Sequence, residues 1–339
     1  MDAESGYPIA SASVYLSNTS IGTVSNDSGE FLINKIPSGK YDLVVSCIGY
    51  ETYIQTLEPG KLAFLNIKLK QRIKELKEVV VESFDKNGWQ KYGNFFLESF
   101  IGKSGNADNC KILNKDVIKF NYSSSKNLLK AFTTEPLIIQ NKALGYNLKY
   151  DLQLFTYNYN TNILYYEGYP FFQDMESNKV HKQKRWLQKR DEAFYGSMMH
   201  FMRALFRNKL AENKFEVRKI VEQKNMNILI DKLLPGDSIA YALDSVTVSL
   251  EFKGKLDIVY KGKRMIYNDN NSSIKFRKDE FPTSQIKLIG DKNIEVVSNG
   301  SYYNPVSVLA NGYWALTEKI ANMLPFDFKP AIQQIKKPK

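Results

Sequence analysis

The sequence predicts a multidomain protein in which an all-β sandwich is followed by a larger α+β domain with mostly antiparallel strands. Three observations predict this class. The chain has 339 residues, which is long enough for two domains. Its first seventy residues alternate apolar and polar side chains with a period of two, and a helical period first emerges after Lys86. Aromatic residues make up 13% of the chain, which favours strands because flat rings pack well on pleated surfaces.

The first seventy residues read as short strands separated by turns. Apolar and polar side chains alternate over 10–16 and again over 41–47. The turn Asn26–Gly29 separates two further strands, at 22–25 and 30–33, as in a hairpin. Two further strands are expected at 51–56 and 65–69, which makes about six strands in all. No helical period occurs among them, and this pattern is typical of a small antiparallel sandwich.

Four segments of this region, in this order, resemble the carboxypeptidase regulatory-like domain: Gly6–Val14, Gly22–Phe31, Pro37–Tyr41 and Ile48–Glu51. The resemblance implies a transthyretin-like, seven-stranded β-sandwich over residues 1–70. The family usually opens with one more strand, so we expect the native chain to extend upstream of Met1 to a signal peptide.

The resemblance does not imply a peptidase. A zinc carboxypeptidase needs a His-x-x-Glu pair and a further histidine downstream. His181 is followed three residues later by Lys184, and His200 by Arg203. With two cysteines and two histidines in the whole chain, we expect no metal and no cofactor.

Residues 71–85 are predicted to be a linker. The run Arg72–Glu82 resembles the segment that follows the same module in TonB-dependent outer-membrane transporters, although the rest of the chain lacks the strand pattern of such a transporter. The shared neighbourhood indicates the envelope of a Gram-negative bacterium. We therefore expect an exported protein of the periplasm or of the outer-membrane or cell surface.

Residues 86–328 are predicted to form the α+β domain, and 329–339 a basic tail. Helices are expected at 89–100, 186–205 and 313–323, and strands at 117–122, 137–139, 147–159, 163–166, 215–221, 245–252, 256–260, 274–276, 286–289 and 294–297. This region resembles the uncharacterised C-terminal domain of bacterial envelope proteins, which implies no activity. The segments that carry the likeness are Phe100–Gly102, Cys110–Asn114, Ala143–Tyr146, Tyr195–Leu205 and Met323–Asp327.

A tyrosine-rich stretch is the first candidate binding site, because rings with a polar tip stack on sugars while staying partly wet. Its candidate residues are Tyr157, Tyr159, Tyr165, Tyr166 and Tyr169. The alternation, however, places Leu148, Tyr150, Leu152 and Leu154 on one strand face and Phe155, Tyr157 and Tyr159 on the other. A strand covered on both sides produces that pattern without any ligand, and this alternative stays open.

A basic segment is the second candidate. Residues 179–224 hold thirteen Lys and Arg against five acids, and four of them are expected on the cationic face of one long helix: Lys182, Arg185, Lys189 and Arg203. Such a face suits an anionic lipid surface or an acidic envelope protein. The alternative is an ordinary solvated helix face. No recognition motif for nucleic acid accompanies the charge, and no apolar run reaches the roughly 20 residues of a transmembrane segment.

Together these observations predict a non-enzymatic binding or scaffolding protein of the cell envelope, whose partner is an envelope protein, a glycan or an anionic lipid surface. The alternative is a hydrolase of envelope polymers or glycans with its site near His200. A cleft that gathers His200, a nucleophile and a carboxylate would favour the enzyme. A filled helix–sheet contact around His200 would favour the binding protein.

Overall fold

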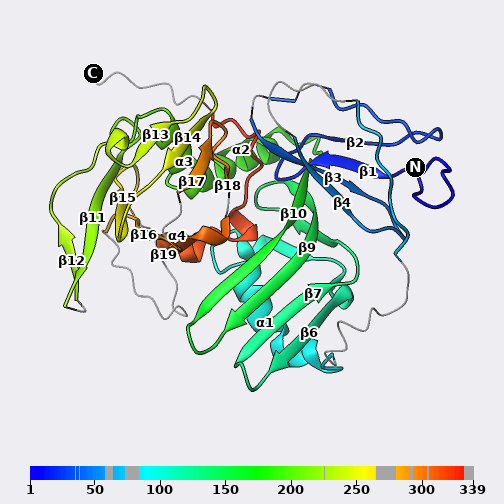
Figure 1. Ribbon diagram of the computed structural model, residues 1–339, viewed down its shortest axis with the longest axis horizontal. Helices are drawn as coiled ribbons and strands as arrows, with labels where there is room; N and C mark the ends of the chain where they lie inside the picture. The colour runs from blue at the N-terminus through cyan, green and yellow to red at the C-terminus, as the bar shows by residue number, and fades with distance from the viewer. Residues whose placement is uncertain are drawn as a thin grey trace. The chain divides into compact units, whose positions relative to one another are not determined.

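The computed structural model describes residues 1–34, 36–37, 39–57, 64–72, 84–224, 226–264, 280–290, 293–303 and 305–331 (Figure 1). The chain packs into two compact units, Met1–Trp186 and Leu187–Lys339. Most of the expected linker at 71–85, most of the basic tail and the strand expected at 274–276 lie outside the described residues. The domain boundaries at residues 70 and 86 therefore stay predictions.

Unit 1 begins with a four-stranded antiparallel sheet in the order β2-β1-β3-β4. The strands are β1 Ser13–Leu16, β2 Gly22–Val24, β3 Tyr41–Ser46 and β4 Tyr53–Leu57. Alternation places Val14, Leu43 and Val45 on one face, where each is at most 4% exposed. Ile67 and Leu69, from the chain after β4, pack into the same core. The β-sandwich expected for the N-terminal region is confirmed.

Two strands expected in this sandwich are not regular strands. Residues 30–34 and 64–68 are irregular chain rather than strands. The chain after β4 instead bonds to the first residues: the Met1 ammonium donates to the Ile67 carbonyl at 3.0 Å, and the Leu69 N–H donates to the Met1 carbonyl at 2.9 Å. Alternation in a sequence identifies extended, half-buried chain, but a strand also needs a partner that continues the ladder.

The second sheet of unit 1 is antiparallel, with the order β5-β8-β9-β7-β6 and β10 paired along β9. Its strands are β5 Cys110–Ile112, β6 Ile118–Ser123, β7 Leu128–Thr133, β8 Leu137–Asn141, β9 Tyr146–Asn158 and β10 Ile163–Asp174. Helix α1 (Gly88–Phe100) packs on one face. Its Phe96 ring lies 4.8 Å from Phe155, and its Phe100 ring lies 5.2 Å from Tyr150. The helix predicted from the apolar stripe is confirmed, and Gly102 follows it with φ +100°.

A β-bulge in β9 corrects the predicted distribution of side chains between the sheet faces. The register of β9 against β10 shifts between Glu167 and Gly168, whose partners are Leu154 and Leu152. The extra residue reverses the alternation. Tyr150 and Phe155, which the sequence places on opposite faces, therefore both contact α1.

The N-terminal sandwich contacts β10 through an extension of the sheet. The Asn18 N–H donates to the Pro170 carbonyl at 2.7 Å, and the Phe172 N–H donates to the Thr19 carbonyl at 3.0 Å. Thr19 and Phe171 form an isolated parallel bridge. Residues 18–19 thus cover part of the outer edge of β10, where unpaired backbone groups would otherwise meet water.

Unit 2 contains two antiparallel sheets, ordered β12-β11-β15-β16-β19 and β13-β14-β17-β18. The first comprises β11 Phe215–Gln223, β12 Met226–Ile230, β15 Lys255–Tyr260, β16 Thr283–Leu288 and β19 Val308–Gly312. The second comprises β13 Ala240–Ala242, β14 Thr247–Leu250, β17 Ile294–Val297 and β18 Tyr302–Tyr303. Mostly antiparallel sheets with few helices confirm the α+β class of this region.

The long helix expected at 186–205 is two helices, α2 (Val180–Phe194) and α3 (Met198–Phe206). The helix is interrupted around Gly196, which has φ +87°. Ser197 caps α3 by accepting the His200 N–H at 3.1 Å. A Cβ at Gly196 would lie 2.6 Å from the Tyr260 ring. Because the helix is interrupted here, α3 has its own axis, and the residues of α3 do not continue the faces of α2.

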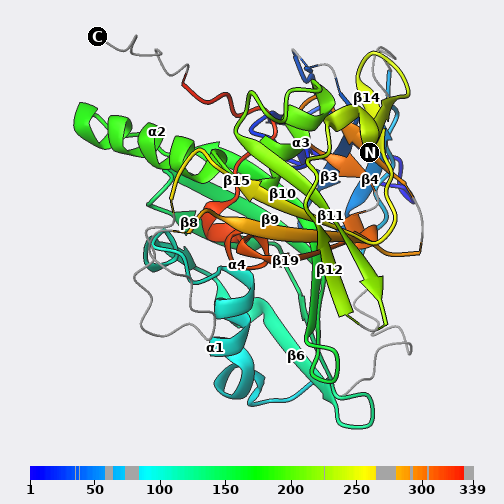
Figure 2. The ribbon, with the colours of Figure 1, turned by 90° about the vertical axis from the view of Figure 1, so that its left-hand side faces the viewer.

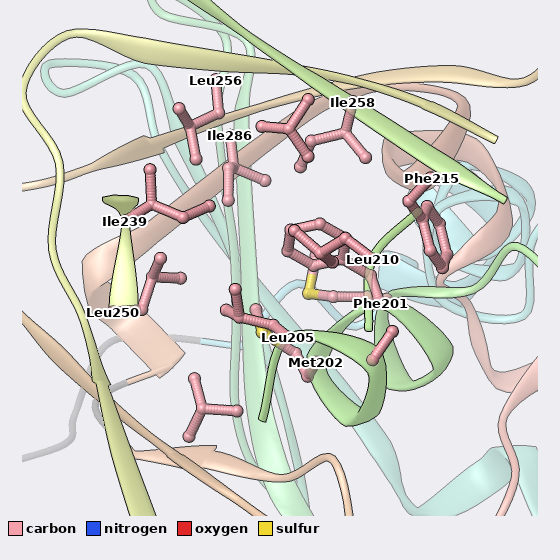
Figure 3. Close-up of a cluster of buried hydrophobic side chains, with 14 of the residues drawn as sticks. Phe201, Met202, Leu205, Leu210, Phe215, Ile239, Leu250, Leu256, Ile258 and Ile286 are labelled. Atoms are coloured by element: carbon pink, nitrogen blue, oxygen red, sulfur yellow. The ribbon is translucent and has the colours of Figure 1, made fainter. Parts of the chain in front are cut away.

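Helix α3 lies in the core of unit 2 (Figure 3). Phe201, Met202 and Leu205 point from the helix toward Leu256, Ile258 and Ile286 of the five-stranded sheet, as Figure 3 shows. The helix expected at 313–323 is shorter, with α4 at Tyr313–Thr317 and a 3-10 turn at Ile320–Asn322.

Candidate functional site

Helix α2 carries three of the four cations selected from the sequence, Lys182, Arg185 and Lys189. Its buried stripe consists of Trp186, Arg190 and Phe194, at most 9% exposed and four residues apart. The Trp186 indole donates to the Lys142 carbonyl at 3.0 Å and lies against Gly145, whose Cβ, if present, would be 2.3 Å from the ring. This packing fixes which side of α2 faces solvent.

The exposed side of α2 combines cations with apolar side chains. Lys184 and Arg185 are exposed, and Val180 and Leu187 are 63% and 54% exposed. Val180, Lys184 and Leu187 share one face because residues three and four apart are helix neighbours. Lys184 is absent from the residues selected by sequence, although its helical position identifies it. A basic face with exposed apolar side chains is typical of helices that meet an anionic interface.

The four cations selected from the sequence have different surroundings. Arg185 is exposed, whereas the Lys182 ammonium lies 4.9 Å from the centroid of the Trp186 ring. Lys189 forms an ion pair with Glu192 at 2.7 Å. These three remain available to solvent on α2.

Arg203 does not belong to this surface. It is 7% exposed, and its guanidinium donates to three carbonyls: Nε to Asn299 at 2.7 Å, and the terminal nitrogens to Phe328 at 2.9 Å and Phe326 at 3.0 Å. Its prediction as part of a cationic surface assumed one continuous helix and is wrong. The break at Gly196 turns this position into the core of unit 2.

The five candidate tyrosines do not form one surface. Tyr157 and Tyr159 contact Phe95 of α1 at 4.7 and 5.9 Å, and Tyr166 contacts Phe100 at 5.2 Å. These three belong to the face that α1 covers, where Tyr159 is 36% exposed.

The other two tyrosines lie on the opposite face of β10. The Tyr165 hydroxyl donates to Glu167, and burial is the main reason that the pKa of Tyr165 is raised. The Tyr169 carbonyl accepts the hydroxyl of Tyr15 from the N-terminal sandwich at 3.2 Å. The candidate tyrosines are therefore divided between the two faces of the sheet, and a ligand-binding role for them stays a prediction.

A polar cluster that no sequence pattern indicates lies between the N-terminal sandwich and β9. The Lys149 ammonium donates to the hydroxyls of Ser46 at 3.0 Å and Ser13 at 3.2 Å. Thr52 donates to the Asp151 carboxylate at 2.7 Å. Burial lowers the pKa of Lys149, and nearby Asp151 opposes this shift. The partners lie 136 and 103 residues from Lys149 along the chain, so no local motif could identify them.

His200 occupies a filled core position. Its Nδ1 accepts the Gly196 N–H at 3.2 Å, and its Nε2 lies 3.2 Å from the Asn213 Oδ1. The Asn213 amide nitrogen donates to the Lys209 carbonyl, so the facing oxygen accepts from a neutral, Nε2-protonated ring. Rings of Phe194, Tyr195, Phe215 and Tyr260 surround it at 4.9 to 5.6 Å. Burial lowers the pKa of His200 to about 4.

Other reactive groups are also enclosed. Cys110 is 6% exposed, and burial raises the pKa of its thiol to about 12, which disfavours the nucleophilic thiolate. No group of three metal-ligating side chains gathers in the part of the chain that the structure describes. Among the described helices, none is both long and apolar enough to cross a membrane.

Comparison with known proteins identifies the first part of unit 1. A family model described as the CarboxypepD_reg-like domain matches residues 1–81. No curated protein and no solved structure was found to match the chain. The matched family is a regulatory-like β-sandwich and not a catalytic domain, which agrees with the sheet β2-β1-β3-β4 and its apolar core. Residues 1–81 are therefore a CarboxypepD_reg-like domain, joined to an α+β region that the match does not reach.

Proposed function

We propose that this chain is an exported, non-enzymatic binding or scaffolding protein of the bacterial cell envelope, working in the periplasm or at the outer membrane or cell surface. The regulatory-like N-terminal domain supports this proposal, since it carries no catalytic machinery of its own. The satisfied ring of His200 supports it too, because a general base needs a ring nitrogen within reach of a substrate proton. The alternative hydrolase near His200 gains no support from the described residues.

The exposed face of α2 is the observation that carries the proposal. Lys184 lies beside Val180 and Leu187, and the next residue, Arg185, is also exposed, so the solvent side of the helix carries both cations and apolar side chains. Trp186 and Phe194 are buried and anchor the helix, so it does not need to rearrange to present these exposed side chains. An anionic lipid surface is the partner that uses both features, through charge attraction and shallow apolar insertion.

Cosedimentation with vesicles tests the proposal. The chain should sediment at low salt with vesicles that contain anionic lipid and remain in solution with vesicles of zwitterionic lipid alone. Each Lys or Arg near an anionic surface adds about 1 kcal/mol, an attraction that fades over a Debye length of about 8 Å at physiological salt. Lys184→Glu with Arg185→Glu should therefore weaken binding by at least about thirtyfold.

A variant with the same change in net charge serves as the control. Lys126 and Lys253 are exposed and lie outside α2. Reversal of both to Glu should leave most of the binding if α2 is the contact surface. Equal losses of vesicle binding in the two variants would show that binding depends only on the net charge of the chain. Absence of binding by the parent chain at low salt would refute the role of α2.

Localisation has its own measurement. Fractionation of cells that produce the native protein should place it in the envelope fractions. Recovery in the cytosol would contradict the proposed location whatever the vesicle experiment gives.

A further inference from the structure

Strand β12 leaves one edge of unit 2 open. It is the outermost strand of the five-stranded sheet, and β11 is its one described neighbour. All five of its residues are exposed, with Met226 at 61%, Ile228 at 36%, Leu229 at 50% and Ile230 at 40%. Figure 1 and Figure 2 show β12 beside β11 at the outer edge of their sheet.

This edge lacks the features that keep other edge strands from pairing. Proteins protect open edges with charged side chains, proline, bulges or a covering element. Residues 226–230 read Met-Asn-Ile-Leu-Ile, with no charge and no proline, and their register with β11 shifts nowhere. An exposed, straight, apolar edge is a surface that another strand can extend.

The hairpin geometry decides which backbone groups face outward. Gln223 and Met226 are the last pair before the turn, and such a pair is bridged by the turn's own hydrogen bond. Bonded and non-bonded pairs alternate along an antiparallel ladder. Met226, Ile228 and Ile230 therefore direct their N–H and C=O groups toward β11, and Asn227 and Leu229 direct theirs toward the open edge.

We propose that the chain forms a homodimer in which β12 pairs antiparallel with β12 of a second copy about a two-fold axis at Ile228. In an antiparallel ladder, two residues that lie opposite each other either both direct their backbone groups toward the partner strand or both direct them away. A two-fold axis meets this condition only if one residue lies opposite the same residue of the other copy. With Ile228 at the axis, the backbone of Asn227 forms hydrogen bonds with the backbone of Leu229 in the partner copy. By symmetry, Leu229 does the same with Asn227 of the partner copy. Met226 then faces the partner's Ile230.

The chain itself selects this register. After Ile230 the backbone bends, and the Lys232 N–H bonds to the Ile230 carbonyl at 2.8 Å. A pairing centred on Leu229 would require Asp231 and Lys232 to continue the strand beyond this bend. The pairing centred on Ile228 uses all of β12 and nothing outside it.

The side chains are self-complementary in this register. Met226, Ile228 and Ile230 lie on one face and meet only apolar partners across the axis. On the other face Asn227, which accepts from Lys255 at 3.1 Å, lies opposite an apolar Leu229. Within β12 no like charges face each other, and like charges directly opposite would oppose pairing. A second copy is therefore the partner that this strand fits.

Sedimentation equilibrium of the full chain over a range of concentrations tests the proposal. The parent chain should be a dimer that dissociates on dilution. Ile228→Lys places two ammonium groups at the axis and should raise the dissociation constant at least tenfold, with an unchanged circular dichroism spectrum. Leu243→Lys is the matched control, since Leu243 is 48% exposed and lies outside β12, and this variant should still dimerise.

Disulfide trapping tests the register. Residues in a non-bonded pair have Cα atoms about 4.5 Å apart, within reach of a disulfide. In a Cys47→Ser background, Ile228→Cys should give a covalent dimer under mild oxidation. Ile230→Cys should not, since the two copies of residue 230 are offset by about 13 Å along the strands.

Three results would overturn the proposal. One is a parent chain that stays monomeric at every concentration and yields no cross-link at position 228. Another is a dimer that survives Ile228→Lys or cross-links equally at 230, which would place the interface elsewhere. The third is association only in the presence of vesicles or of a second protein, which would assign the edge to a membrane or to another partner.

Discussion

Arg203 allows a sharp test of how unit 2 is held together, since it was expected at the surface and is found in the core. Its guanidinium spans two parts of the chain, bonding to Asn299 in one segment and to Phe326 and Phe328 in another. Its stem approaches Gly300, and its charged group lies 5.1 Å from the Phe194 ring. Arg203→Met keeps most of the volume and removes all three hydrogen bonds.

The size of the loss follows from these bonds. A hydrogen bond to a charged group contributes about 1.5–3 kcal/mol, and a buried carbonyl left without a donor costs about 1–3 kcal/mol. Water can reach some of the carbonyls, so we expect the free energy of unfolding of unit 2 to fall by about 3–5 kcal/mol. In a domain of this size that lowers Tm by at least about 6 °C.

Differential scanning calorimetry measures the loss, and hydrogen exchange locates it. Amides of 324–328 should exchange faster in Arg203→Met, because that segment loses two of its bonds to α3. Arg185→Met makes the same chemical change on an exposed residue and should alter stability by no more than about 0.5 kcal/mol. If the two variants unfold alike, Arg203 does not hold the segment and the reasoning fails.

Three other predictions concern single features of the fold. Gly145→Ala should cost about 2–5 kcal/mol in a thermal unfolding measurement, because φ is +71° and a Cβ would lie 2.3 Å from the Trp186 ring; Gly105→Ala, with open space around it, should cost much less. The pKa of His200 is lowered to about 4, so the unfolded chain binds the proton first, and stability present above about pH 6.5 should decline toward pH 4. His200→Gln should remove about 2–3 kcal/mol of the difference in unfolding free energy between pH 7.5 and 4.5, and an unchanged difference would contradict this. After cleavage at a protease site engineered into the 71–85 linker, the two pieces should co-elute in gel filtration because of Lys149 and the Asn18 contact with β10, whereas separate elution would show that these bonds do not hold them.

The sequence by itself determined the elements with a strong local period. Alternation and turn residues predicted the sheet of the N-terminal sandwich, and the aromatic stripe at 89–100 predicted α1, because burial of one face imposes these periods on any chain. The same reasoning predicted the exposure of Arg185, which lies off the buried Trp186 stripe. Lys182 and Lys189 are half-buried, and Lys182 lies against the Trp186 ring.

Only the tertiary structure decided the features that depend on partners far along the chain. A single extra residue in β9 reversed the faces of the tyrosine stretch, and the bulge is defined by pairing with β10 rather than by any residue of β9. Gly196 ends one helix because Tyr260, 64 positions later, leaves no room for a side chain and the backbone turns to positive φ there. Because the helix is interrupted there, Arg203 lies in the core and not on the surface of α2. In the same way, the hydrogen bond between Lys149 and Ser13 joins residues that are 136 positions apart. Local periods report which face is buried, but they carry no information on what buries it, so a surface can be assigned only once the packing is known.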